Sequence, residues 1–136
     1  KMSEHEYVKW NGRKSNVVNL TNKDFKDNKL NKFKGKFCLL KVYAKWCGYC
    51  RMMYSDINYL ADNLPKKDFK VCALDFDNNM EIAQKLGVNG FPSLFMVDEK
   101  GELEKLELNN RSIENILDVI CSKTEKYNKN KKVCLK

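Results

Sequence analysis

Histidine is nearly absent from this chain of 136 residues, in which His5 is the only one. A structural zinc site usually takes four cysteine or histidine ligands, arranged as two closely spaced pairs. Cys47 and Cys50 form one such pair, but Cys121 and Cys134 lie too far apart in the sequence to form the second. The sequence therefore predicts no metal site.

Long apolar runs are also missing. No run approaches the roughly 20 apolar residues that a helix needs to cross a bilayer, and residues 1–6 lack the apolar stretch of a signal peptide. We therefore expect no membrane association and a cytoplasmic location. An oxidising compartment is the alternative, and the chain would reach it through a leader removed before residue 1.

The cysteines are too few and too widely spaced for a fold that is built on disulfides. The six are Cys38, Cys47, Cys50, Cys72, Cys121 and Cys134. Cys38 and Cys72 lie in apolar runs, where a free cysteine packs as a small hydrophobic side chain. Cys121 shares an apolar helical face, and the sequence is compatible both with a bond to Cys134 and with two loose thiols.

The net charge of +8 is concentrated at the C-terminal end of the chain. Residues 123–136 carry six lysines against Glu125 and so supply +5 of the total. We expect a solvated basic tail over these residues and a mildly basic body before them. Nucleic-acid binding is not favoured, because no aromatic-rich basic groove accompanies the tail.

The pattern of apolar residues predicts a single α/β domain over residues 16–122, after a polar extension (residues 1–15) from which Trp10 docks on the domain. We expect strands at residues 17–20, 37–44, 69–76, 91–97 and 103–108, helices at 48–63, 79–86 and 113–121, and a weaker helical face with Phe25 and Leu30 after Thr21. Helices connect the first strands, and a turn connects the last two. This order predicts a central mixed sheet flanked by about four helices.

The most informative stretch is Trp46-Cys47-Gly48-Tyr49-Cys50, which joins the expected central strand to the helix that follows it. Backbone N–H groups left unpaired at the start of a helix stabilise an anion. A thiolate is the anion available here, and it is the nucleophile of thiol–disulfide exchange. We therefore expect Cys47 to be exposed and more acidic than a free cysteine, with Cys50 shielded one turn into the helix.

Three segments of the chain resemble the thioredoxin family. Residues 46–50 resemble its active site, residues 88–94 resemble its second signature, the cis-proline loop, and residues 17–21 resemble its opening strand. The resemblance extends over residues 16–122 with the motifs in the right order. It implies a thioredoxin-like fold and a thiol–disulfide oxidoreductase that acts on protein disulfides and dithiols.

The resemblance also implies a role for each matching residue. Cys47 is the attacking thiolate, Cys50 resolves the mixed disulfide, and Trp46 shapes the surface beside them. Pro92 is cis and faces the thiols, while Phe91 offers backbone groups to an extended substrate segment. No metal or organic cofactor is implied, since the cysteine pair itself cycles, and a reductase of this kind needs an external recycling reductase.

Lys41 departs from the family pattern, which usually has a buried acid at this position. A lysine on a buried strand is unfavourable unless it is paired or neutral. Three interpretations are open: the side chain reaches solvent and has no catalytic part, it accepts the proton of Cys50, or it stays charged and favours the thiolates. The last would stabilise the reduced form and make the protein a better oxidant.

Tyr49 is the second departure, because cytosolic thioredoxins usually have proline there. In this family the residues between the cysteines, here Gly48 and Tyr49, tune the reduction potential, and the pair implies a potential away from the strongly reducing end. Reductase and isomerase or oxidase activity both stay open. A non-catalytic docking module and a glutathione-dependent glutaredoxin are less favoured, because both cysteines are kept and Trp46 directly precedes Cys47.

Overall fold

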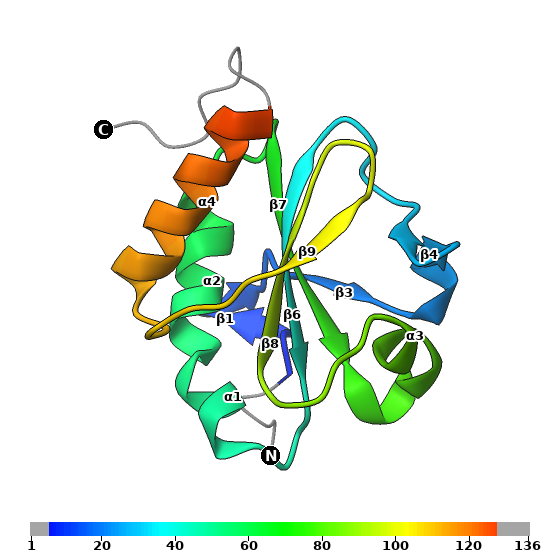
Figure 1. Ribbon diagram of the computed structural model, residues 1–136. Helices are drawn as coiled ribbons and strands as arrows, with labels where there is room; N and C mark the ends of the chain where they lie inside the picture. Colours follow the sequence, from blue (N-terminus) through cyan, green and yellow to red (C-terminus); the bar gives the residue numbers. More distant parts are fainter. Residues whose placement is uncertain (1–5, 128–136) are drawn as a thin grey trace.

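The computed structural model describes residues 6–127, which form a sheet of five strands with helices on both faces (Figure 1). The strands of this sheet are β3 (Val18–Leu20), β6 (Phe37–Tyr43), β7 (Phe69–Asp75), β8 (Ser93–Val97) and β9 (Leu103–Lys105). The helices are α1 (Gly48–Met52), α2 (Tyr54–Asn63), α3 (Met80–Lys85) and α4 (Ile113–Tyr127). Among the described residues, no helix combines the length and the apolar character needed to span a bilayer.

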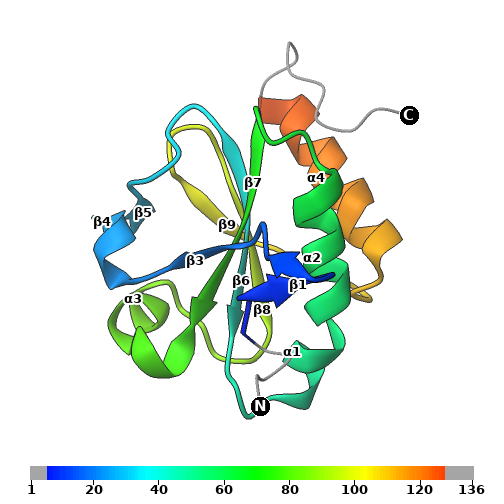
Figure 2. The same cartoon turned by 180° about the vertical axis from the view of Figure 1, so that it is seen from behind.

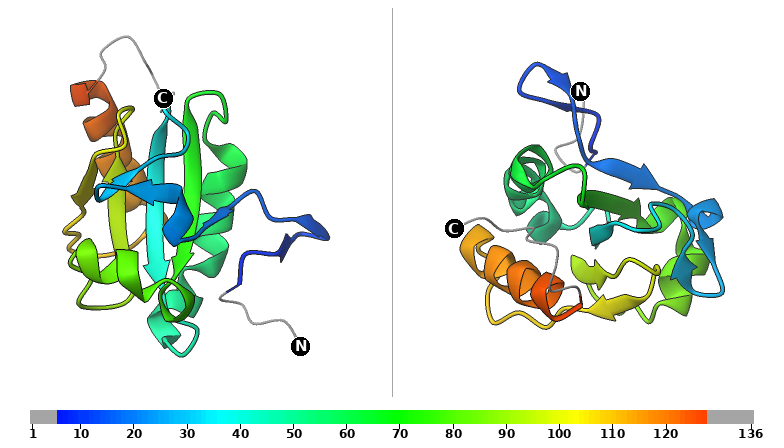
Figure 3. Two further views of the ribbon diagram at one scale, coloured as in Figure 1. Left: turned by 90° about the vertical axis from the view of Figure 1, so that its right-hand side faces the viewer. Right: turned by 90° about the horizontal axis from the view of Figure 1, so that it is seen from above.

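The strand order is β3-β7-β6-β8-β9. Neighbours β3, β7 and β6 run parallel, whereas β8 is antiparallel to β6 and β9 is antiparallel to β8. Helices α2 and α4 cover one face of the sheet, and α3 covers the other, as the views from behind and from above also show (Figures 2 and 3). The predicted α/β fold with a central mixed sheet is confirmed.

The central strand β6 is buried along its whole length, and its side chains alternate between two apolar clusters. Phe37, Leu39 and Tyr43 belong to the cluster that includes residues of α2 and α4, such as Ile57 and Ile116. Cys38, Leu40 and Val42 belong to the cluster that includes residues of α3. Because alternate residues of a strand point to the same face, Lys41 lies on the α2 and α4 side of the sheet.

The helix expected after Thr21 is wrong. Thr21 does cap a turn, the 3-10 turn η1 (Asn22–Asp24), but a hairpin of β4 (Phe25–Lys26) and β5 (Lys29–Leu30) follows it. The two connecting residues, 27 and 28, both have positive φ, at 52° and 61°. Two residues of this conformation make the tight turn that joins antiparallel strands, so Phe25 and Leu30 are cross-strand partners and not neighbours on a helix.

The helix expected at residues 48–63 is interrupted at Met53, where α1 ends and α2 begins. The carbonyl oxygen of Cys50 accepts the Met53 N–H at 3.3 Å and the Nζ of Lys41 at 2.7 Å. A side chain that inserts into the hydrogen-bond ladder of a helix is a known cause of such a break. Lys41 therefore shapes the helix that carries the cysteines.

The segment before residue 16 packs on the domain. It forms a hairpin of β1 (Lys9–Trp10) and β2 (Arg13–Lys14). The Trp10 Nε1 donates to Asp62 of α2 at 3.0 Å, so Trp10 docks as expected. Ser15 is buried and donates to Asn58 of the same helix at 2.6 Å.

Candidate active site

Cys47 lies at the N-cap of α1, immediately after the turn that follows β6. The backbone N–H of Cys50 donates to the Cys47 sulfur at 3.4 Å, and Cys47 and Cys50 are both free thiols. A sulfur in this position takes up one of the N–H groups that the helix leaves unpaired. Because α1 is only five residues long, this contact involves the N–H groups of one helical turn and not the dipole of a long helix.

The expected exposure of Cys47 is wrong. This residue keeps 8% of its accessible surface, and Cys50 keeps none. The loop before β8 covers the first sulfur, because the Cys47 thiol donates to the carbonyl oxygen of Phe91 at 3.4 Å. The loop therefore leaves only a small part of Cys47 accessible to a substrate disulfide.

Three large, mainly apolar side chains close to Cys47 in the sequence are exposed, and we call them the apolar rim. Trp46, Tyr49 and Met52 are 66%, 69% and 75% exposed, and Gly48 is exposed between them. The Trp46 ring meets the Phe91 ring edge to face, with 5.3 Å between the centroids. An apolar rim of this kind suits an extended polypeptide better than a small polar molecule.

The peptide bond between Phe91 and Pro92 is cis, as predicted, and Pro92 is buried. The guanidinium of Arg111 donates to the Pro92 carbonyl at 3.2 Å. The sequence analysis missed Arg111, because nothing in the spacing of the chain connects it with residues 91 and 92. The contact fixes the loop that faces the thiols.

Lys41 is fully buried beneath α1. Its Nζ donates to the Tyr7 hydroxyl at 2.6 Å and to the Cys50 carbonyl at 2.7 Å, and it lies 5.6 Å from the centroid of the Tyr43 ring. The interpretation that this lysine reaches solvent is therefore wrong. The side chain has too little length to escape from a central strand that is covered on both faces.

Burial lowers the pKa of Lys41 to about 8, while the nearby Cys50 and Cys47 act in the opposite direction. Burial also raises the pKa of the Cys50 thiol to about 12, and its hydrogen bond with Cys47 adds to this rise. The charge of Lys41 opposes the rise at Cys50. The lysine thus lies close enough to act on the Cys50 thiol, and it can change its own charge near neutral pH.

Tyr7 is a residue of this site that the sequence analysis missed. It is 2% exposed, although it precedes the first hairpin and stands in a polar run. Burial raises its pKa, so it stays a neutral hydroxyl at neutral pH. No periodic pattern surrounds Tyr7 in the sequence. In the fold its hydroxyl accepts a hydrogen bond from Lys41, and its ring belongs to the same apolar cluster as Cys47 and Cys50.

The other described cysteines lie away from α1. Cys38 and Cys72 are free and buried in the cluster on the α3 side of the sheet, as expected. Cys121 is disulfide-bonded, and Cys134, its possible partner in the sequence analysis, lies outside the described residues. Within residues 6–127, no three side chains of histidine, cysteine, aspartate or glutamate are grouped as a metal ion requires.

Comparison with known proteins connects this geometry with established families. The sequence model of the Thioredoxin family matches residues 16–122. Thioredoxin of Pseudomonas aeruginosa is 35% identical over 88 residues, which cover 65% of this chain and 78% of that protein.

Several protein disulfide-isomerases also match. Protein disulfide-isomerase 1 of Dictyostelium discoideum is 37% identical over 83 residues, which cover 59% of this chain and 22% of that protein. Protein disulfide-isomerase tigA of Aspergillus niger is 31% identical over 110 residues, which cover 79% of this chain and 30% of that protein. The chain thus spans only about a fifth to a third of the length of these isomerases.

Proposed function

This chain belongs to the thioredoxin family and carries the domain of a thiol–disulfide oxidoreductase, and from this premise we propose that it exchanges disulfides with protein substrates through Cys47 and Cys50. The observation that carries the proposal is the position of the Cys47 sulfur. It accepts the Cys50 N–H at the start of α1 and lies against the loop of the cis Phe91–Pro92 bond.

The proposed reaction has two exchange steps. The Cys47 thiolate attacks one sulfur of a substrate disulfide, the substrate S–S bond breaks, and the second substrate sulfur leaves as a thiolate. The Cys50 thiol then gives its proton to a released substrate thiolate, and its sulfur attacks the Cys47 sulfur and releases the first substrate sulfur as a thiolate. Two electrons pass to the substrate, and the enzyme is left with a disulfide between Cys47 and Cys50.

Substrate recognition is proposed to involve the apolar rim of Trp46, Tyr49 and Met52. An extended segment of substrate would lie across this rim and pair with backbone groups beside Phe91, as a strand adds to an open edge. Gly48 leaves room for the approach to Cys47, because it adds no side chain to the rim. The reaction as proposed uses no metal or organic cofactor, and a dithiol donor or a recycling reductase would return the pair to the reduced form.

Lys41 is proposed to favour the thiolates as a buried cation. Its pKa of about 8 leaves it mostly protonated at neutral pH, and its charge interacts favourably with the ionised form of either cysteine. A stabilised thiolate makes the reduced form more favourable and the disulfide form more oxidising. The competing interpretation, in which a neutral Lys41 accepts the proton of Cys50, would make the resolving step faster as the pH rises through 8.

Isomerase or oxidase activity in an oxidising compartment is the second candidate function. The cation at Lys41 favours it, and so does the disulfide at Cys121, because structural disulfides persist in oxidising compartments. Reductase activity in the cytoplasm remains the alternative. The state of Cys121 in protein isolated from its own cells with the thiols trapped by acid distinguishes them, since a free thiol there favours the cytoplasm.

Reduction of insulin disulfides by dithiothreitol tests the proposed function. We expect the protein to accelerate this reaction and Cys47→Ser to abolish the acceleration, because the attacking sulfur is lost. Cys38→Ala is the matched control, since it removes a thiol from the other side of the sheet and is expected to keep the activity. A Cys47→Ser variant as active as the wild-type protein would overturn the proposal, and an inactive wild-type protein would favour a docking module.

A further inference from the structure

Tyr7 is the buried group beneath the cysteines that the proposed reaction does not use. Its hydroxyl accepts a hydrogen bond from Lys41 at 2.6 Å. Its ring stacks on Tyr54 with 5.0 Å between the centroids and meets Tyr43 edge to face at 5.9 Å. Tyr7 therefore has little freedom to turn away from Lys41.

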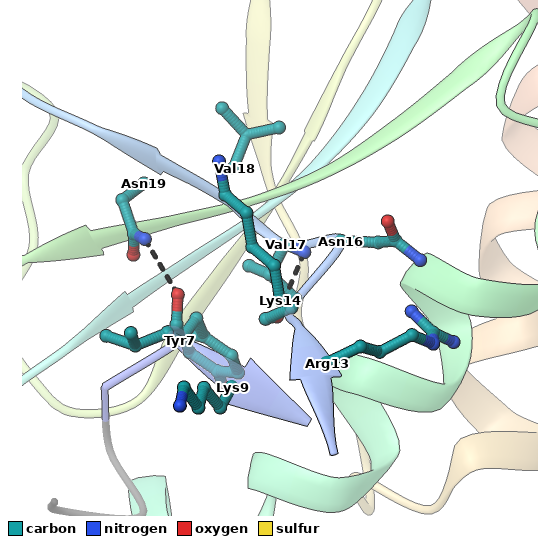
Figure 4. A pocket seen from close by; sticks show the side chains of 10 residues that line it. Tyr7, Lys9, Arg13, Lys14, Asn16, Val17, Val18 and Asn19 are labelled. Carbon is teal, nitrogen blue, oxygen red and sulfur yellow. Dashed lines mark hydrogen bonds between the residues drawn. The ribbon is translucent and has the colours of Figure 1, made fainter. Parts of the chain in front are cut away.

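The backbone around Tyr7 is also fixed. The Asn19 side chain donates to the Tyr7 carbonyl at 2.9 Å (Figure 4), and Ser15 N–H donates to the Val8 carbonyl at 2.9 Å. The first contact connects the segment before β1 with the edge strand β3, and the second joins the two ends of the β1–β2 hairpin. Both lie beside a hollow of about 750 Å³. The N-terminal segment thus places the Tyr7 ring and hydroxyl against the sheet at a defined point.

We propose that Tyr7 is a positioning residue of the redox site: its hydroxyl holds the charged Lys41 side chain against the Cys50 carbonyl, so that the N-terminal segment sets the potential of the cysteine pair. This inference rests on the proposed thiol–disulfide exchange. It gives a redox role to residues that lie before the region matched by the family.

The physical reason is the hydrogen bonding of a buried ammonium. Lys41 has three N–H donors, and the Tyr7 and Cys50 oxygens accept two of them. A buried charge that loses an acceptor is strongly disfavoured relative to its neutral form. Removing the Tyr7 oxygen therefore lowers the pKa of Lys41 and reduces its positive charge at neutral pH.

The other groups that face Lys41 do not replace this contact. Tyr43 of β6 and the two cysteines at the start of α1 face Lys41 directly. Tyr54 of α2 stacks on the Tyr7 ring. Burial raises the pKa of Tyr43, so its hydroxyl is neutral near pH 7. The Tyr54 hydroxyl donates to the Lys9 carbonyl at 2.6 Å.

Tyr7→Phe tests the proposal, because it keeps the stacked ring and removes only the hydroxyl. We expect the equilibrium with glutathione near pH 7 to move toward the enzyme disulfide by about three- to tenfold, which corresponds to about 15–30 mV. Near pH 9, where Lys41 is mostly neutral in both proteins, the difference should shrink to less than about twofold. Tyr54→Phe is the matched control, expected to leave the equilibrium unchanged at both pH values.

A second readout separates positioning from a general loss of packing. In a Lys41→Met background, Tyr7→Phe should cause no further change, because the cation that it positions is already absent. An equal shift near pH 7 and near pH 9, or a shift that persists without Lys41, would overturn the proposal, and so would no shift near pH 7. If the wild-type protein does not accelerate the reduction of insulin, that result would instead contradict the proposed function.

Discussion

A lysine on the central strand changes the electrostatics of the cysteine pair beside it. Lys41 replaces an acid in the family pattern, and its ammonium is surrounded by the Tyr7 hydroxyl, the Cys50 carbonyl and aromatic rings. An acid at this point would repel a thiolate, whereas a cation attracts it. We therefore expect this one residue, which lies outside the cysteine motif, to make the cysteine pair more oxidising than an acid at the same position would.

Lys41→Asp should make the Cys47–Cys50 pair more reducing. The substitution removes a cation and introduces an anion, so the reduced form loses stability relative to the disulfide. Each unit of rise in the pKa of a cysteine that is ionised at the working pH is about 1.4 kcal/mol, which for this two-electron couple lowers the potential by about 30 mV. The equilibrium with glutathione measures the change.

Lys45→Met is the control for the loss of a positive charge near the site. Lys45 directly precedes Trp46, but its side chain is 42% exposed and pairs with Glu6 and Asp75. We expect a much smaller effect there, because solvent screens an exposed charge. An unchanged potential in Lys41→Asp, together with an unchanged pH dependence of the rate, would show that the buried charge does not act on the cysteines.

At the scale of elements, one carboxylate of α2 makes three of the contacts that hold the N-terminal hairpin. Asp62 accepts hydrogen bonds from Trp10 at 3.0 Å and from Asn16 at 2.7 Å, and it pairs with Arg13 at 3.2 Å. These contacts lie on both sides of the β1–β2 hairpin. Asp62 thus connects the hairpin to the helix whose first turn follows the cysteines.

Asp62→Ala should release the hairpin and leave the sheet intact. We expect a loss of about 1–3 kcal/mol in the free energy of unfolding, because donors of the hairpin lose their shared acceptor. Hydrogen exchange of the amides in residues 9–14 should become faster, while exchange in β6 and β7 stays slow. Asp56→Ala, on the same helix, is the control, and equally fast exchange in both variants would contradict this role.

Elements with a clear pattern could be predicted from the sequence, and elements that depend on turns or distant contacts could not. The apolar runs of β6 and β7 and the spacing of α4 are visible in the chain itself. The β4–β5 hairpin was missed because its strands are two residues long and its turn depends on the backbone of residues 27 and 28. The break at Met53 was missed because it accompanies a contact from Lys41, which is remote in sequence.

The residues of the candidate site also fall into those that the sequence could predict and those that depend on the folded arrangement. The resemblance to the thioredoxin family pointed to Cys47, Cys50 and Pro92, because each stands in a short segment of sequence that resembles one of its motifs. It could not reveal how far Phe91 covers Cys47, since that depends on how a loop from another part of the chain packs. Tyr7 and Arg111 were missed for the same reason, as each touches the site only through the folded arrangement.

For the whole molecule, the buried lysine makes stability depend on pH in a definite direction. Its pKa falls from 10.5 to about 8 on folding, so between these values the unfolded chain binds more protons than the native protein. The contribution of Lys41 therefore destabilises the fold below about pH 8 and fades as the pH rises toward 10.5. Cys50 acts in the opposite direction, because its pKa is raised from 9 to about 12 on folding. Its contribution destabilises the fold increasingly as the pH rises above 9.

Comparison of Lys41→Met with the wild-type protein isolates the lysine contribution, because Cys50 and the tyrosines are present in both. We expect the variant to gain most in relative stability below pH 8, since methionine fills the site without a buried charge. This advantage should fall by up to about 3 kcal/mol as the pH rises from about 8 to 10.5. Urea unfolding of both reduced proteins across this range measures it. A difference in unfolding free energy that is constant with pH would mean that Lys41 binds its proton equally well in the folded and unfolded chain, and the electrostatic account of the site would then fail.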